Sequence, residues 1–220
     1  MLVKSKGNMY GFVDFTWNPI KGKCEYDCVY CFMKKWGNLK PPRLVEKEFK
    51  EFASDMKKYG ENKFIFVGSS IDMFAKSIPS EWLQRVFRTC YEYNNTYLFQ
   101  SKNPGRFLDF VYPFEVMFGT TLESNRDYEG MSKAPKIDER VRAMINLRND
   151  GKRTMVTIEP VLNFDMGELV AMLNAMDPEW VNLGADSGDN KLPEPSKEKL
   201  LELMDLIQYR KKKNLQRLLK

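Results

Sequence analysis

Three of the four cysteines in the chain lie close together, as Cys24, Cys28 and Cys31 in a C-x3-C-x2-C spacing. Cysteine thiolates bind iron–sulfur clusters as well as zinc. Three thiolates this close can bind three irons of a cubane cluster and leave the fourth iron open. An iron with an open position can react with a bound molecule, whereas a structural site fills all its positions with protein ligands. The spacing therefore predicts that these residues hold a reactive four-iron four-sulfur (4Fe-4S) cluster.

Two other uses of the thiols stay open at this point. A structural zinc site would take Cys90 as its fourth ligand and would make the protein a non-catalytic interaction module. Structural zinc sites usually present their ligands in two short hairpins, whereas Cys90 lies in a helical pattern of apolar residues, which favours a place in the core. A disulfide framework is typical of small secreted chains, and this chain has 220 residues and no recognisable signal sequence.

The cysteine loop resembles the signature of the radical S-adenosylmethionine (SAM) enzymes, which carry this spacing and an aromatic residue directly before the last cysteine, here Tyr30. Residues 16–19, Thr-Trp-Asn-Pro, are similar to the segment before the cysteines in small phage and prophage proteins of that family. The resemblance implies a 4Fe-4S cluster and SAM as cofactors, and a SAM-derived 5′-deoxyadenosyl radical that abstracts hydrogen from a substrate. It also implies an electron donor such as flavodoxin or ferredoxin.

The elements that must position these residues follow a repeated strand–helix pattern, which is typical of a parallel sheet. The predicted strands cover residues 12–17, 64–68, 97–100, 116–121, 154–159 and 180–184. The predicted helices cover residues 46–59, 80–93, 138–149, 167–176 and 196 to about 219, with a short helical turn at 106–110. Six such units are too few for a closed eight-stranded barrel, and the resemblance implies an open, partial (β/α)6 barrel in one domain spanning residues 1–220.

Local signals fix several element ends. Ser80 and Ser196 are each placed to cap the first turn of a helix, because a hydroxyl can accept a hydrogen bond from its free amide groups. Gly151 is placed to end the helix before it in a left-handed conformation. The prolines at 41 and 42 limit any helix after Cys31 to a short one.

Polar residues at the ends of the predicted strands are the candidates for binding SAM, because ligands of parallel α/β proteins bind at the carboxyl ends of the strands. The resemblance places the SAM amino group at the second strand end. A lysine at the third could pair with the SAM carboxylate, and the residues at the fourth could hydrogen-bond its ribose or methionyl part. The residues at these ends are Gly68, Ser69, Ser70, Asp72, Ser101, Lys102, Thr120, Thr121, Glu123 and Glu159.

The substrate predicted from the sequence is a nucleic-acid base or nucleotide, with a thymine-type base in DNA favoured. Ser-Ser-x-Asp and Ser-Lys at the second and third strand ends resemble the SAM pocket of the spore photoproduct lyase family. That family has a hydrogen-donating cysteine after the second strand, where this chain has serines, so repair of a thymine dimer by that route is not expected. Trp36, Phe74 and Tyr128 are placed to stack on a base.

A basic run near the end of the chain predicts contacts with phosphates, although such runs are commonly only solvated. Its residues are Arg210, Lys211, Lys212, Lys213 and Arg217. A peptide- or protein-modifying enzyme of the same family is the alternative, although such enzymes usually carry further cysteines or a recognition domain.

Composition narrows the classes of function. The chain has no histidine, which excludes Ser-His-Asp triads and histidine-ligated zinc. Hydrophobic residues make up 43% and charged residues 30%, with a formal net charge of +5, which is typical of a globular protein. Residues 1–6 lack the apolar stretch of a signal peptide, and no apolar run approaches the roughly 20 residues that span a bilayer. We therefore expect a cytoplasmic protein, whose thiols stay reduced.

Overall fold

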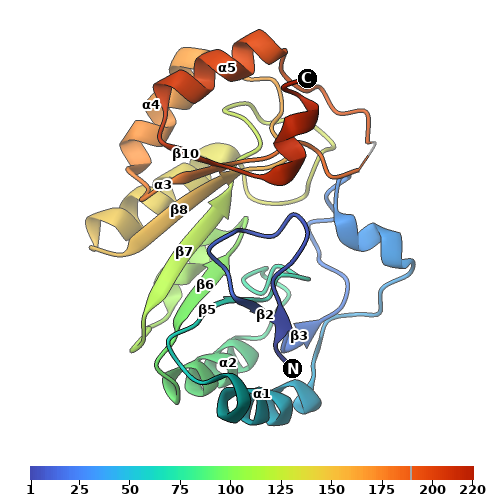
Figure 1. The fold of residues 1–220 in the computed structure, drawn as a ribbon, viewed down its shortest axis with the longest axis vertical. Coiled ribbons are helices and arrows are strands. Elements are labelled where there is room, and N and C mark those ends of the chain that lie inside the picture. Colours follow the sequence, from blue (N-terminus) through green and yellow to red (C-terminus); the bar gives the residue numbers. More distant parts are fainter. Residues whose placement is uncertain (189) are drawn as a thin grey trace.

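A mostly parallel sheet forms the centre of the molecule (Figure 1). In the computed structural model, which describes residues 1–188 and 190–220, its strand order is β1-β2-β5-β6-β7-β8-β9-β10. All neighbouring pairs are parallel except β1–β2. These strands are β1 (Val3–Lys4), β2 (Phe15–Trp17), β5 (Phe64–Val67), β6 (Thr96–Gln100), β7 (Val116–Thr121), β8 (Arg153–Ile158), β9 (Val181–Leu183) and β10 (Tyr209–Lys211). The edges β1 and β10 do not pair within this described part, so the barrel is open.

Helices follow most of the parallel strands and pack on the outer face of the sheet (Figure 1). The α-helices are α1 (Glu46–Tyr59), α2 (Ser80–Tyr91), α3 (Ile137–Asn149), α4 (Met166–Met176) and α5 (Lys197–Leu206). Short 3-10 helices are η1 (Phe32–Trp36), η2 (Pro104–Asp109) and η3 (Lys213–Arg217), and a two-stranded ribbon joins β3 (Ile20–Lys21) to β4 (Arg43–Leu44). No helix of the described residues is long and apolar enough to cross a membrane.

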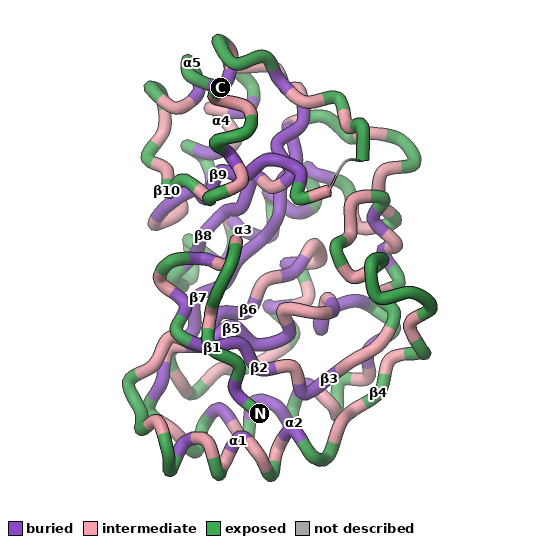
Figure 2. Tube along the Cα trace, turned by 45° about the vertical axis from the view of Figure 1, so that its right-hand side comes forward, coloured by how far each residue is buried: buried purple, intermediate pink, exposed green. Residues whose placement is uncertain are grey.

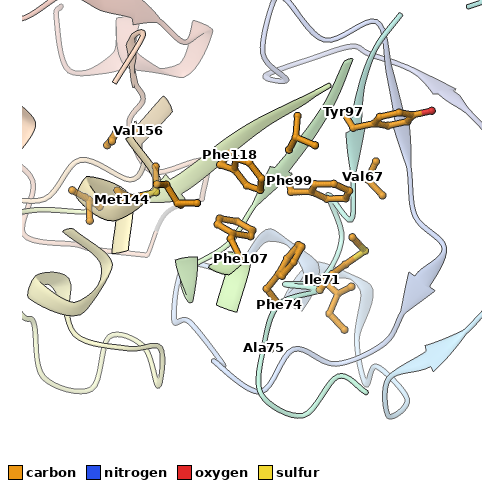
Figure 3. Packing of buried hydrophobic residues seen from close by; sticks show 14 of the residues in the cluster. Val67, Ile71, Phe74, Ala75, Tyr97, Phe99, Phe107, Phe118, Met144 and Val156 are labelled. Atoms are coloured by element: carbon orange, nitrogen blue, oxygen red, sulfur yellow. The ribbon is translucent and has the colours of Figure 1, made fainter. Parts of the chain in front are cut away.

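Side chains alternate along each strand, so each strand contributes apolar residues to both faces of the sheet. Outer-face residues such as Phe99 and Phe118 pack with Phe74 and Phe107 beneath the helices (Figure 3). Inner-face residues form a second cluster with Tyr10 and Val13 from the segment before β2; they are Phe66, Leu98, Met117 and Met155. Figure 2 shows the buried residues concentrated along the central strands. Two members of this inner cluster, Tyr10 and Phe66, also line a cavity at the carboxyl ends of the strands.

The structure confirms the α/β fold and the six predicted parallel strands, which are β2 and β5 to β9. Helices predicted at 46–59, 80–93, 138–149 and 167–176 are present within two residues of the predicted ends. Gly151 is left-handed, with φ of 70°, and Ser196 Oγ accepts from the amide of Lys199 at 3.2 Å, as predicted. Ser80 does not cap α2; its hydroxyl instead accepts a hydrogen bond from Arg106 at 3.2 Å.

The long helix predicted for residues 196–219 is wrong. The chain turns extended at Ile207, and β10 then pairs with the whole of β9. An exposed strand edge carries free N–H and C=O groups, and satisfying them outweighs the small helix preference of a Lys/Arg run. The basic residues therefore lie on an edge strand and the short η3, not on one helix face.

Candidate active site

A cavity of about 560 Å³ opens at the carboxyl ends of the strands. The cysteine loop forms one wall, the turns after β5 and β6 form another, and residues from the two chain ends form the far side. Most of the predicted site residues line it: Cys24, Cys28, Tyr30, Cys31, Gly68, Ser69, Ser70, Asp72, Ser101, Lys102, Thr121 and Glu159. The fold thus gathers residues that are more than 100 positions apart around one space.

The cysteine loop is held against the segment that follows β7. The amide of Val29 donates to the carbonyl of Met131 at 3.0 Å, and the amide of Lys133 donates to Tyr26 at 2.8 Å. Cys28 Sγ lies 3.2 Å from Ser132 Oγ. All three thiols are free of disulfides and line the cavity. The short helix predicted after Cys31 is η1.

Cys90 is fully buried in the core on α2 and does not line the cavity. Burial raises the pKa of its thiol well above the usual range, so it stays protonated and inert. The zinc site that would use Cys90 as its fourth ligand is therefore not formed. Burial, followed by the nearby Asp72, raises the pKa of Cys24 to about 12, so binding of a metal at this thiol must release its proton.

Cys24, Cys28 and Cys31 are the candidate ligands for a cluster. Among residues 1–188 and 190–220, no three Cys, Asp or Glu side chains are placed to hold one metal ion. A cubane cluster instead takes its thiolates at separate irons. Tyr26 Oη is buried on the cavity wall and finds no hydrogen-bond partner in the described chain. A buried hydroxyl without a partner is costly to the folded state.

Asp72 joins the turns after β5 and β6. Its carboxylate accepts hydrogen bonds from Ser101 Oγ at 2.7 Å, from the Lys102 amide at 2.7 Å and from the Phe74 amide at 3.0 Å. Burial raises its pKa, and these hydrogen bonds oppose the rise. Asp72 and Ser101 therefore form a rigid acceptor group on the cavity wall.

Asn18 shapes the serine turn, a role that the sequence reading missed. Its Oδ1 accepts from the amide and the hydroxyl of Ser70, both at 2.9 Å, and its Nδ2 donates to Ser69 Oγ at 3.2 Å. Gly68 begins the turn with φ of 83°, and a Cβ there would lie 2.5 Å from Met73 Cγ. Glycine is thus needed by backbone conformation and by space. The only sequence signal for Asn18 was its place in Thr-Trp-Asn-Pro.

Lys102 is held at the cavity wall by a buried charge network. Its ammonium contacts Tyr30 Oη and Glu123 Oε1, and Arg140 Nη1 pairs with Glu123 Oε2 at 3.0 Å. Burial alone would raise the pKa of Glu123, but Lys102 and Arg140 outweigh it and lower the pKa to about 2. Glu123 lies behind the wall and does not line the cavity. Its predicted contact with SAM is therefore replaced by a positioning role for Lys102 and Tyr30.

The two threonines at the end of β7 face opposite ways, because strand side chains alternate. Thr121 lines the cavity, and its Oγ1 accepts from Gln100 Nε2 at 3.0 Å. Thr120 is fully buried and donates to the carbonyl of Ser101 at 2.8 Å. The prediction that Thr120 contacts SAM is therefore not supported by its position.

Glu159 lines the far side of the cavity from the end of β8. It pairs with Lys212 at 2.8 Å and accepts hydrogen bonds from Asn8 at 2.7 Å and Asn214 at 2.8 Å. A Cβ at residue 184 would lie 2.8 Å from its Cδ, so Gly184 leaves the room that it occupies. Asn8 and Asn214 come from opposite ends of the chain, and no sequence pattern indicated that they meet here.

The five basic residues expected to contact phosphates do not lie together on one face. Lys212 turns inward, where its Nζ lies 4.2 Å from the centre of the Tyr10 ring. Arg210 stacks 3.6 Å from the centre of the Trp180 ring, and Arg217 forms an ion pair with Glu194. Lys211 and Lys213 are exposed. These positions contradict a single basic helix face that contacts nucleic acid.

The aromatic residues proposed to stack on a base lie elsewhere. Phe74 is a core residue, and Tyr128 Oη donates to the carbonyl of Asn163 at 2.7 Å. Trp36 is 75% exposed on η1. None of the three lines the cavity.

Solved structures share this arrangement. A double mutant of spore photoproduct lyase, with bound AdoMet (SAM) and dinucleoside spore photoproduct, superimposes with a TM-score of 0.66 at 13% identity, over 91% of this chain and 64% of that chain. Methylornithine synthase (PylB) superimposes with a TM-score of 0.55 at 15% identity, over 88% and 63%. Both are radical SAM enzymes. The chain has the radical SAM fold.

The radical SAM fold accounts for the open sheet and for the cavity at its strand ends. The chain spans less than two thirds of the length of both proteins. Comparisons with known protein families and with curated sequences find no match. The likeness therefore establishes the fold.

Proposed function

We propose that the protein is a radical SAM enzyme that acts on a nucleic-acid base. The observation that carries the proposal is the position of Cys24, Cys28 and Cys31, which line the strand-end cavity of a radical SAM fold. When bound, a reduced 4Fe-4S cluster and SAM supply a 5′-deoxyadenosyl radical that abstracts hydrogen from a substrate. The chain's task is to bind, orient and shield the reacting groups.

The cavity wall offers matching partners for each part of SAM. The three thiolates would hold the cluster. The oxygens of Asp72, Ser101 and the serine turn are acceptors for an ammonium group. The Lys102 ammonium, fixed by Tyr30 and Glu123, is a partner for a carboxylate. Thr121 Oγ1 is within the same wall and is suited to a ribose hydroxyl.

The far side of the cavity supports a base as substrate. The Lys212 ammonium and the Asn8 amide both donate to the Glu159 carboxylate, which lies between them. All three residues line the cavity. They present a donor, an acceptor and a donor in order. The imide edge of thymine or uracil presents an acceptor, a donor and an acceptor, which is the complementary order. The same groups fit a flipped or single-stranded base, which exposes this edge.

The test is mass-spectrometric detection of 5′-deoxyadenosine formed with candidate substrates. Anaerobically reconstituted protein, SAM and dithionite would be incubated with a thymidine-containing oligonucleotide or with its N3-methylthymidine analogue, which cannot donate from N3. We expect more 5′-deoxyadenosine with the first than with the second, together with a new mass in the oligonucleotide. Equal formation with both, or with neither, would contradict a base as the substrate while leaving SAM cleavage itself as a separate result.

A further inference from the structure

A groove of about 380 Å³ lies beside α2, where one strand–helix unit lacks its helix. The strands β5, β7, β8 and β9 are each followed by an α-helix of at least 10 residues. β6 is followed only by the six-residue η2 and by residues 110–115, which form neither helix nor strand. The groove runs between this thinner connection and α2, and none of its lining residues lines the cavity at the strand ends.

The groove has an aromatic floor with large apolar side chains exposed beside it. Phe87 and Phe110 form the floor, with their ring centres 5.4 Å apart in an edge-to-face arrangement. Val111 is 85% exposed and Tyr91 65%, and Leu108, next to the groove, is 43% exposed. Burying such side chains would release free energy, because apolar surface would leave water. Several exposed apolar side chains around one hollow are typical of a protein interaction site.

Two side chains of opposite charge flank the apolar part of the groove. Arg88 and Asp109 both line it and are both exposed. Neither side chain forms an ion pair or a hydrogen bond within residues 1–188 and 190–220. A guanidinium and a carboxylate form a paired set of hydrogen bonds when they meet in one plane. Both groups are therefore available to a partner of opposite charge.

These features make the groove complementary to itself. A two-fold interface brings the same surface of two copies together, so each protruding group and each charge must find its complement on that same surface. The groove supplies both members of each pair, namely Val111 with the Phe87–Phe110 floor, and Arg88 with Asp109. A partner of another sequence would need only one member of each pair on this chain. The pairing of both members within one patch therefore favours a second copy.

We propose that this groove is the interface of a two-fold homodimer. Val111 of each copy packs on the aromatic floor of the other, and Arg88 of each copy pairs with Asp109 of the other. The strand-end cavity of both copies stays open, because other residues line it. The proposal is independent of the proposed function, since it requires neither a cluster nor SAM.

The first test is sedimentation velocity of the full chain over about 1–200 µM. We expect the fraction of dimer to rise with concentration. Val111→Lys brings an ammonium against the aromatic floor, so the Kd of the dimer should rise at least about tenfold. The matched control is Leu201→Lys, which changes an exposed leucine on α5 outside the groove and should alter Kd less than about twofold. A monomer at every concentration, or the same Kd for Val111→Lys and the unmodified protein, would overturn the proposal.

The second test exchanges the charges. Arg88→Asp and Asp109→Arg each bring like charges together at both contacts, so each variant alone should show a Kd at least about tenfold higher. Both residues are exposed, so neither change disturbs the core. An equimolar mixture of the two variants restores opposite charges at both contacts, and we expect it to dimerise with a Kd within about threefold of the unmodified protein. A mixture that dimerises no better than its components would show that Arg88 and Asp109 do not meet across an interface.

Discussion

At the scale of single residues, Glu123 shows how a candidate ligand can serve a site without touching it. The sequence placed it at a strand end with the residues expected to bind SAM, and that much is correct. The structure turns it behind the wall, where it neutralises both Lys102 and Arg140. Its side chain is 8% exposed and that of Arg140 5%, so this ion pair is buried. The sequence did not reveal this because Arg140 lies on a different element, α3.

Glu123→Gln keeps the side-chain shape and removes the charge that balances two buried cations. We expect the free energy of unfolding to fall by on the order of 3 kcal/mol, because one partner of a buried ion pair is lost. Urea denaturation followed by circular dichroism measures it. Glu179→Gln, which removes the partially exposed pair with Arg153, should cost less than about 1 kcal/mol. Similar losses in the two variants would contradict the buried network.

The lowered pKa of Glu123 predicts that the stability of the protein depends on pH. Its pKa is lowered in the folded state, from 4.5 to about 2. Its contribution is therefore fully present above the unfolded pKa and is lost as the pH falls through the folded one. The difference in unfolding free energy between the unmodified protein and Glu123→Gln should shrink as the pH is lowered from about 5.5 to about 3. A difference that stays constant over this range would show that Lys102 and Arg140 do not lower the pKa of Glu123.

At the scale of elements, the sequence predicted what depends on local pattern. The six central strands and four of the helices follow from apolar periodicity and turn residues, and β7 matches its predicted bounds. The grouping of Cys24, Cys28 and Cys31 at one site was predicted from their spacing in the sequence alone. β10 could not be predicted, because residues 207–211 become a strand only through the free edge of β9. The far side of the cavity could not be predicted either, since Asn8 and Asn214 meet only in the folded chain.

Gly184 tests whether the end of β9 is shaped to admit Glu159. Gly184→Ala places a methyl group 2.8 Å from Glu159 Cδ, which is too close, so we expect a loss of about 1–3 kcal/mol in unfolding free energy and a displaced Glu159. Gly167→Ala is the matched control, because nothing lies within 4 Å of its Cβ position in α4. That change should be neutral or stabilising by up to about 1 kcal/mol. Equal effects at both glycines would remove the packing argument for Gly184.

At the scale of the whole molecule, the cysteine loop lines two hollows, of about 560 and about 500 Å³. The larger cavity is built from strand ends and is lined by both polar and apolar side chains. The smaller hollow is lined by Lys23, Lys34 and residues 37–39. The cysteines contact both.

The measurement that tests the central claim most directly is 5′-deoxyadenosine formation by a cysteine series. The unmodified protein and four single Cys→Ala variants would be reconstituted anaerobically, assayed for bound iron, and given SAM and dithionite. We predict about four irons per chain and 5′-deoxyadenosine for the unmodified protein and for Cys90→Ala, because that thiol is buried in the core. Cys24→Ala, Cys28→Ala and Cys31→Ala should lose both. Bound zinc without iron, or loss of the cluster in Cys90→Ala alone, would contradict the account.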